Sequence, residues 1–368
     1  MMRESLRLPE HAPYRLVVGV GGIGTGAFFA LDGNHTLGRN ESRPARLLDV
    51  RDYYKLHIIL HYVAVLLGAH PSGLPFHVVP IGNVGDDAAG RQMRQEMAAA
   101  GMDVNLVQTI AGAPTPFGIC FQNPDGSGGN ITATNGAAQM LTPADVARAE
   151  PLLRAHAGRA IVVAAPEAPL AARSQLLKMG TDYRCLRVAA LASAEILPAQ
   201  EMGLMRCIDL LAINEDEAAL LAGRSFDEEN PQPFLDDCAR AVASFNAGMN
   251  LVVTCGKRGA YAFSRGAWDF CPALPVEVVS TAGAGDALLG ALIACLAAGV
   301  PLSNPGRPRV ALTDRPLDSA LDYGVLLAAF TITSPHSIHP DASVMSLGRF
   351  ADSLGLRCGG ALRRCVQS

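Results

Sequence analysis

From about residue 158 onward, short apolar runs alternate with longer segments in which apolar side chains recur every three or four positions. The runs have the length of strands, and the longer segments have the period of a helix. This alternation predicts a mostly parallel sheet that is covered by helices on both faces. The predicted strands are 159–165, 185–191, 208–213 and 250–256, and the predicted helices are 169–180, 198–206, 215–223 and 234–248.

The first part of the chain has a different pattern, because a glycine-rich and charged stretch follows its first apolar run. The hairpin predicted there rests on a Pro-Asp-Gly turn between an apolar and a polar strand. We expect residues 24–53 and 103–135 to form a small strand-rich lid within a single domain that spans 1–368. The predicted elements are a strand at 15–21, a helix at 53–68, a strand at 76–82, a helix at 89–101 and the hairpin at 115–136.

Apolar residues make up 49% of the 368 positions, and the net charge is −4 with both signs mixed along the chain. Nucleic acids and anionic membranes bind basic patches, so we expect neither as a partner. The nine cysteines form no Cys-x-x-Cys pair, which favours small buried side chains in a reducing compartment. Because no signal-peptide core or apolar window of ~18–20 residues occurs, the sequence predicts a soluble cytoplasmic protein.

A glycine-rich loop at 278–293 carries the main candidate chemistry. It leads into apolar residues at helical spacing, so Gly283, Ala284 and Gly285 are predicted at a helix N-terminus. Amides there have no partners within the helix and can hold an anion. Asp286 follows at once, and a carboxylate beside a bound phosphate suits a base that takes a proton from an attacking hydroxyl. The alternative is an acid that only stabilises the first helical turn, by ~0.3–1 kcal/mol.

The motif Thr-Ala-Gly-Ala-Gly-Asp at 281–286, with its apolar helix, resembles the signature of the ribokinase family of carbohydrate kinases, the phosphofructokinase-B type. Three further stretches, at 81–104, 213–223 and 252–263, resemble the family's other blocks and follow in the same order. The resemblance covers about residues 15–345. It implies a three-layer α/β sandwich with a mostly parallel central sheet and a β lid. It also implies an enzyme that transfers the γ-phosphoryl of ATP to a hydroxyl of a sugar or sugar-like acceptor.

The same resemblance implies roles for the glycine-rich loop. Asp286 is expected as the general base, Gly283 as part of the catalytic loop, and the amides of Ala284, Gly285 and Asp286 as the anion hole. Thr281 is expected at the nucleotide. The family usually has an Asp at the position of Ser280, where it helps hold an activating monovalent cation. Because Ser280 replaces this Asp, a requirement for potassium is in doubt.

Asn214 and Glu217 follow a predicted strand and open a predicted helix. Their spacing alone favours a capping box. By resemblance, the pair organises Mg²⁺ through water near the nucleotide phosphates, and both roles are compatible. Thr254 and Gly256 resemble family residues at the nucleotide site.

A Gly-x-Gly-x-x-Gly pattern at 19–24 follows the first predicted strand and invites a dinucleotide-binding interpretation. The residues after it make a poor helix, so we set that interpretation aside. By resemblance, this region serves the acceptor pocket instead, where similar kinases place an Asp. The nearest acid here is Asp32.

The family's Gly-Gly-x-x-x-Asn sugar-binding element is absent from 52–68. The acceptor candidates are therefore Asp32, Arg43, Lys55 and His57. Because arginine and lysine suit carboxylates and phosphates, the sequence predicts an anionic acceptor, and a solvated lid surface is the alternative. His57 and His61 share a helix face, which permits a metal pair but more often means two satisfied core histidines.

Two other functions stay open at this point. One is a nucleoside kinase, and the other is a degenerate kinase fold that binds a ligand or regulates without catalysis. Exposed edges of a strand-rich lid also predict a homodimer through the lids.

Overall fold

The computed structural model describes residues 4–33, 38–124, 128–305 and 311–366. Its centre is a nine-stranded sheet in the order β13-β12-β11-β10-β9-β8-β1-β4-β5, parallel except at the β11-β12-β13 edge. The strands are β1 (Leu16–Val20), β4 (His77–Gly85), β5 (Val107–Ile110), β8 (Ala160–Ala164), β9 (Leu186–Ala190), β10 (Leu210–Asn214), β11 (Asn250–Thr254), β12 (Gly259–Ser264) and β13 (Ala267–Pro272). The predicted mostly parallel α/β sheet is confirmed.

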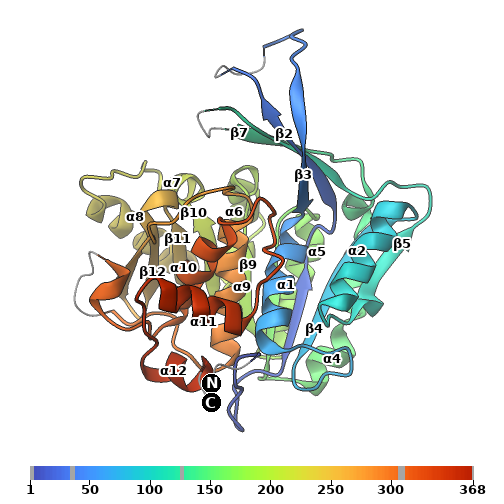
Figure 1. The fold of residues 1–368 in the computed structure, drawn as a ribbon. Coiled ribbons are helices and arrows are strands. Elements are labelled where there is room, and N and C mark those ends of the chain that lie inside the picture. The colour runs from blue at the N-terminus through green and yellow to red at the C-terminus, as the bar shows by residue number, and fades with distance from the viewer. Residues whose placement is uncertain (1–3, 34–37, 125–127, 306–310, 367–368) are drawn as a thin grey trace.

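Helices cover both faces of this sheet and complete three layers (Figure 1). Every residue of β1 and β8 is buried, as expected for central parallel strands covered on both sides. One face packs against α1 (Lys55–Leu67), α2 (Ala88–Ala99), α9 (Ala284–Ala297), α10 (Ala320–Thr331), α11 (Val344–Ser353) and α12 (Gly360–Val366). The other face packs against α3 (Pro143–Ala147), α4 (Glu150–Ala155), α5 (Leu170–Asp182), α6 (Ile196–Glu201), α7 (Glu215–Ala222) and α8 (Gln232–Phe245).

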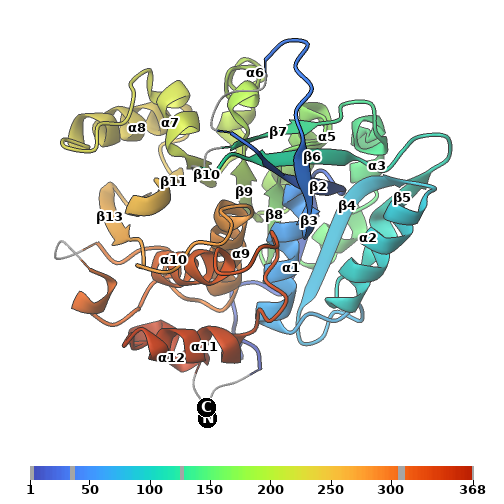
Figure 2. The same cartoon turned by 45° about the horizontal axis from the view of Figure 1, so that its top comes forward.

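A separate four-stranded sheet stands above the carboxyl ends of the central strands (Figures 1 and 2). Its order is β3-β2-β6-β7, with bounds β2 (Thr25–Leu31), β3 (Ala45–Tyr53), β6 (Phe117–Gln122) and β7 (Gly128–Thr132). The hairpin β6-β7 is antiparallel as predicted. By contrast, β2 and β6 are distant in the sequence and pair in parallel, from Thr25 with Phe117 to Ala30 with Gln122. β5, which lies within 103–135, pairs with β4 in the central sheet and not in the lid.

The glycines after β1 serve close packing and not a dinucleotide. The chain passes from β1 directly into β2, with no helix between them. A Cβ on Gly22 would lie 2.5 Å from the Glu167 Cβ, and one on Gly24 would lie 2.4 Å from the Pro116 carbonyl oxygen. These glycines therefore let the lid and the loop after β8 approach the end of β1.

No helix in the described ranges is long and apolar enough to cross a membrane. All nine cysteines are free, and six of them are buried, in line with the expected role as small apolar side chains.

Candidate active site

Asp286 lies in the first turn of α9, at the carboxyl end of the central sheet. The helix begins after Gly283, whose φ of 79° and whose approach to the Ser337 carbonyl oxygen, 2.2 Å from a would-be Cβ, both require glycine. No atom lies within 4 Å of a Cβ built on Gly285, so the space over this turn is open. The first amides of α9 have no acceptor within the helix, and only that of Ala284 makes a long bond, 3.4 Å, to the Thr281 carbonyl. The loop therefore presents donors to an open space beside a carboxylate.

Asp286 is paired with Lys55, the first residue of α1. The Lys55 Nζ lies 3.4 Å from Asp286 Oδ2, and the Asp286 residue is only 9% exposed. Burial raises the pKa of Asp286, and the Lys55 ammonium opposes that rise. The carboxylate in turn raises the pKa of Lys55, which stays charged. The base candidate is thus a buried carboxylate held beside one ammonium.

Glu167 is a second buried acid at this point, and no sequence motif led us to it. It follows β8 with a backbone φ of 70°, which is unusual for a residue other than glycine and is often found at functional sites. Its Oε2 accepts the Lys55 backbone N–H at 2.9 Å. Burial raises the pKa of Glu167 to about 7, against the Lys55 charge and with help from Asp286 and Asp52.

Asp52, at the end of lid strand β3, completes this group of charges. Its Oδ2 accepts the Cys120 thiol at 3.2 Å, and its charge contributes to the raised pKa values of both Asp286 and Glu167. Three acids and one ammonium therefore interact with one another where the lid meets α1 and α9. We call Asp286, Lys55, Glu167 and Asp52 the acceptor cluster.

A cavity of about 470 Å³ opens on the other side of the loop. Thr254, Gly256, Thr281, Ala284 and Gly285 line it, and the first three are residues that we expected at the nucleotide. Its remaining wall is mostly apolar and comes from the segment after β13 and from α9 and α10; it comprises Lys257, Gly259, Ala273, Leu274, Pro275, Val276, Val278, Leu288, Val325, Ala328, Ala329 and Ile332. An apolar slot that ends at a helix N-terminus suits a planar base with phosphates at one end.

A smaller cavity of about 100 Å³ links this slot to the acceptor cluster, because Thr254 and Gly285 line both. Asn214 and Glu217 line it together with Lys55 and Asp286. The slot and the smaller cavity are thus adjacent, and the smaller cavity reaches Asp286.

Asn214 and Glu217 form the capping box of α7. The Asn214 side chain accepts the Glu217 N–H at 2.8 Å, and Glu217 Oε2 accepts the Asn214 N–H at 2.8 Å. Burial raises the pKa of Glu217. The box uses Oε2 and leaves Oε1 of Glu217 without a bond in it, so the capping role and a contact to a hydrated cation are compatible.

The other predicted acceptor residues do not line either cavity. Asp32 is exposed just after β2. Arg43 lies just before β3, where its guanidinium is 2.8 Å from the Glu41 carboxylate. His57 is 1% exposed inside α1, where its ring lies 4.6 Å from that of Tyr53. Among the residues that we expected to touch the acceptor, only Lys55 lies at Asp286.

The histidines also cannot supply positive charge. Burial lowers the pKa of His57 to about 3 and that of His61 to about 4. No group of three or more His, Cys, Asp or Glu side chains in the described ranges could hold a metal, so the pair has no third ligand. Of the cations expected at the acceptor, Lys55 lines a cavity with Asp286 whereas Arg43 lies elsewhere, so the charge of the acceptor stays a prediction.

The glycine-rich helix start can hold a phosphate beside Asp286, an arrangement that suits transfer of a phosphoryl group to a hydroxyl. The family profile of the pfkB family carbohydrate kinases matches residues 63–343. The chain belongs to this family, and it is a carbohydrate kinase by class. The match ends before α11.

Individual relatives agree with this assignment. A fructokinase of Klebsiella pneumoniae is 31% identical over 245 residues, which cover 60% of this chain and 72% of the relative. A bifunctional ribokinase/ribose-5-phosphate isomerase A of Fructilactobacillus sanfranciscensis is 30% identical over 61% of this chain, but the match spans only 39% of that longer relative. The ribokinase of Cryptococcus neoformans var. grubii serotype A, solved in complex with ADP, has the same fold, with a TM-score of 0.69 at 18% identity over 91% of this chain and 99% of the other.

Proposed function

We propose that the protein transfers the γ-phosphoryl group of ATP to a hydroxyl of a neutral, sugar-like acceptor, with Asp286 as the general base. The observation that carries the proposal is the position of Asp286, which lines the passage between the apolar slot and the acceptor cluster. The amides of Ala284, Gly285 and Asp286 lie at the helix start, where they would stabilise charge on the transferred phosphoryl group. The acceptor hydroxyl would give its proton to an Asp286 oxygen as it attacks.

The apolar slot is proposed to hold the adenine and ribose, with Thr254, Gly256 and Thr281 near the phosphates. Magnesium fits the residues present, since Glu217 offers one carboxylate oxygen outside its capping box and Mg²⁺ usually keeps several waters. Asn214 and Glu217 would hold it through water, and the ion would offset phosphate charge. Ser280 is buried and its Oγ accepts the Ala282 N–H at 3.2 Å, so we propose no requirement for a monovalent cation at this position.

The acceptor cluster suits a neutral polyol better than an anion. Around a single ammonium, the charge of Asp52 raises the pKa values of Asp286 and Glu167, and that of Asp286 raises the pKa of Glu167. A second anion would add to this repulsion, whereas hydroxyls donate to carboxylates and accept from Lys55. The cluster therefore replaces our expectation of an anionic acceptor.

We propose one kinase unit over 1–368 that dimerises through its lid. Leu47 on β3 is 65% exposed, and Ile131 on β7 is 61% exposed. Both lie on edge strands of the four-stranded lid sheet, where a second copy could pair. Residence in the cytoplasm stays a prediction.

The test is phosphotransfer from ATP across one panel of neutral sugars, sugar phosphates, sugar acids and nucleosides. We expect the highest kcat/KM for a neutral sugar or sugar alcohol. A nucleoside as best acceptor would make the protein a nucleoside kinase, and a phosphorylated or acidic sugar as best acceptor would overturn the neutral-acceptor proposal. Binding of ATP without transfer to any acceptor would favour a degenerate, regulatory kinase fold.

A further inference from the structure

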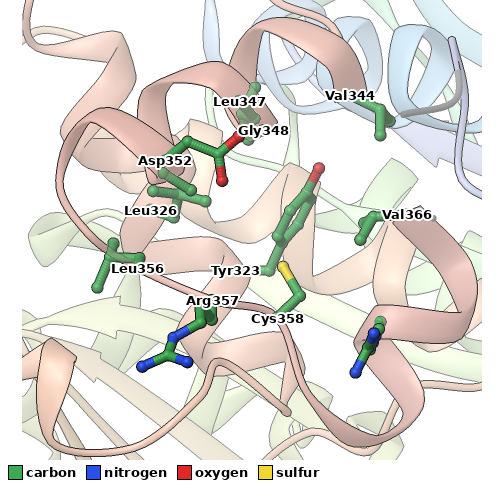
Figure 3. A pocket seen from close by; sticks show the side chains of 12 residues that line it. Tyr323, Leu326, Val344, Leu347, Gly348, Asp352, Leu356, Arg357, Cys358 and Val366 are labelled. Carbon is green, nitrogen blue, oxygen red and sulfur yellow. The ribbon is translucent and has the colours of Figure 1, made fainter. Parts of the chain in front are cut away.

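A third cavity lies far along α10 from the glycine-rich loop, between α10, α11 and α12 (Figure 3). Its volume is about 300 Å³, at the lower end of the range for small-molecule pockets. Ten of its lining residues come from the segment after residue 343; the full lining is Tyr323, Leu326, Val344, Leu347, Gly348, Ala351, Asp352, Leu356, Arg357, Cys358, Arg363 and Val366. We call it the C-terminal pocket.

Tyr323 is the unusual member of this lining. It is 2% exposed, and its hydroxyl has no hydrogen-bond partner among the described residues. An unpartnered buried hydroxyl costs about 1–3 kcal/mol and calls for an explanation. Figure 3 shows the ring standing in the pocket with its hydroxyl directed toward Val344. The hydroxyl therefore offers a donor and an acceptor to whatever fills the space.

The two ends of the pocket differ in chemistry. Apolar side chains of Leu326, Val344 and Val366 surround the tyrosine (Figure 3). The Arg357 side chain lies at the opposite end from the Tyr323 hydroxyl (Figure 3). Arg357, Arg363 and Asp352 line the pocket, and the Arg357 guanidinium can pair with an anionic group. A single ligand that reaches both ends would have an apolar body, an anionic group and a second hydrogen-bonding group.

We propose that the C-terminal pocket binds a small amphipathic carboxylic acid, with its carboxylate at Arg357 and a hydroxyl or carbonyl at Tyr323. The cavity exceeds the ~30 Å³ share of one water about tenfold, so it has room for a small organic molecule. An acid of this shape satisfies the buried hydroxyl and the charge together. Neither the acceptor nor the nucleotide has a place here, because none of the lining residues lines the other two cavities.

The same helix connects this pocket to the nucleotide slot. Tyr323 and Leu326 line the pocket, whereas Val325, Ala328 and Ala329 of α10 line the slot. A ligand that shifts or stiffens α10 changes the walls of both. The acid is therefore an effector that alters nucleotide affinity, and linkage requires that the nucleotide alter its affinity equally. This last step alone rests on nucleotide binding in the slot.

Calorimetric titration of the full chain with 4-hydroxybenzoate, benzoate and 4-hydroxybenzamide tests the proposal. We expect saturable binding of 4-hydroxybenzoate, and we expect Tyr323→Phe to weaken it about 2–13-fold, the worth of one hydrogen bond, while benzoate binding is unchanged. Arg357→Gln should weaken both acids and spare the amide. Tyr183→Phe, which removes a hydroxyl bonded to Glu150 on another helix pair, is the matched control and should change nothing.

No saturable binding of any probe to the wild-type chain overturns the proposal, as does equal binding by the wild type, Tyr323→Phe and Arg357→Gln. The variants leave the acceptor cluster intact, so unliganded phosphotransfer should persist in them. Titration of ADP with and without 4-hydroxybenzoate tests the coupling. If the acid does not change the Kd of ADP, the pocket binds a ligand but has no regulatory role. If ADP does not bind at all, the result counts against the nucleotide slot instead.

Discussion

The Lys55 ammonium lies 3.4 Å from Asp286 Oδ2, although the two residues are 231 positions apart in the sequence. The contact joins the N-terminus of α1 to that of α9, beneath the lid. The ammonium opposes the rise that burial causes in the pKa of Asp286, and it lies where an acceptor hydroxyl would bind.

Lys55→Met should shift the pH dependence of activity. The ammonium lowers the pKa of Asp286 against the effect of burial, so its loss should raise that pKa further. Because a general base must be deprotonated, the acid limb of the kcat/KM profile should move to higher pH. Lys178→Met, at an exposed position of α5, is the control. An unmoved acid limb with normal KM would show that Lys55 does not act on the base.

Glu167→Gln should remove a pH-dependent part of stability. The pKa of Glu167 is about 7 in the folded state and 4.5 in the unfolded state. Between these two pH values, the folded state therefore holds a proton that the unfolded state has lost. The contribution is full below pH 4.5 and disappears as pH rises through 7, and it amounts to about 3 kcal/mol. Urea unfolding at pH 5 and pH 8 should therefore give a smaller loss of stability in Glu167→Gln than in the wild type. Equal losses in both, with the exposed Glu201→Gln as control, would contradict the raised pKa.

Much of the fold could be predicted from the sequence because its central strands and several helices have clear local patterns. The helix α9 and its glycine start are an example, since Gly283, Gly285 and Asp286 lie next to one another in the chain. By contrast, α10 is buried almost all round and has no amphipathic period, and we predicted neither it nor the helices after it. The C-terminal pocket, which these helices form, could therefore not be predicted from the sequence.

The acceptor cluster depends on contacts between distant segments. Glu167 follows β8, and β8 pairs with β1 where the strand order reverses, which is the place where open α/β sheets bind ligands. The sequence does show an acid shortly after a predicted strand. It does not show the order of the strands in the sheet, and that order is what places this acid at a ligand-binding position. His57 was misjudged for a similar reason, since sequence could not show which face of α1 the core covers.

Glu217→Gln tests the proposed magnesium role against the capping role. We expect a higher Mg²⁺ concentration for half-maximal activity and a loss of about 1 kcal/mol in stability. Asp145→Asn is a matched control, because Asp145 closes an equivalent capping box with Thr142 on α3. Both variants should lose similar stability, but only Glu217→Gln should change the Mg²⁺ requirement. If the two variants have the same Mg²⁺ dependence as the wild type, Glu217 is only a cap.

Leu47→Lys and Ile131→Lys should disrupt a dimer that forms through the lids. Each puts a charge on an exposed apolar position of an edge strand of the lid sheet. Light scattering after size exclusion should give a dimer for the wild type and for Leu197→Lys, whose site on α6 is equally exposed at 59%. The two lid variants should be monomeric. A monomeric wild type at micromolar concentration would remove the dimer.

The central claim is that Asp286 takes the proton of the acceptor hydroxyl, and Asp286→Asn tests it most directly. Steady-state kinetics with the best acceptor should show kcat lowered by about 10²–10⁴-fold. The ADP Kd, measured by calorimetry, should stay near that of the wild type, because the amides of the loop remain. Asp216→Asn, in the first turn of α7 and exposed, should retain full activity. A kcat for Asp286→Asn close to the wild-type value would contradict the account.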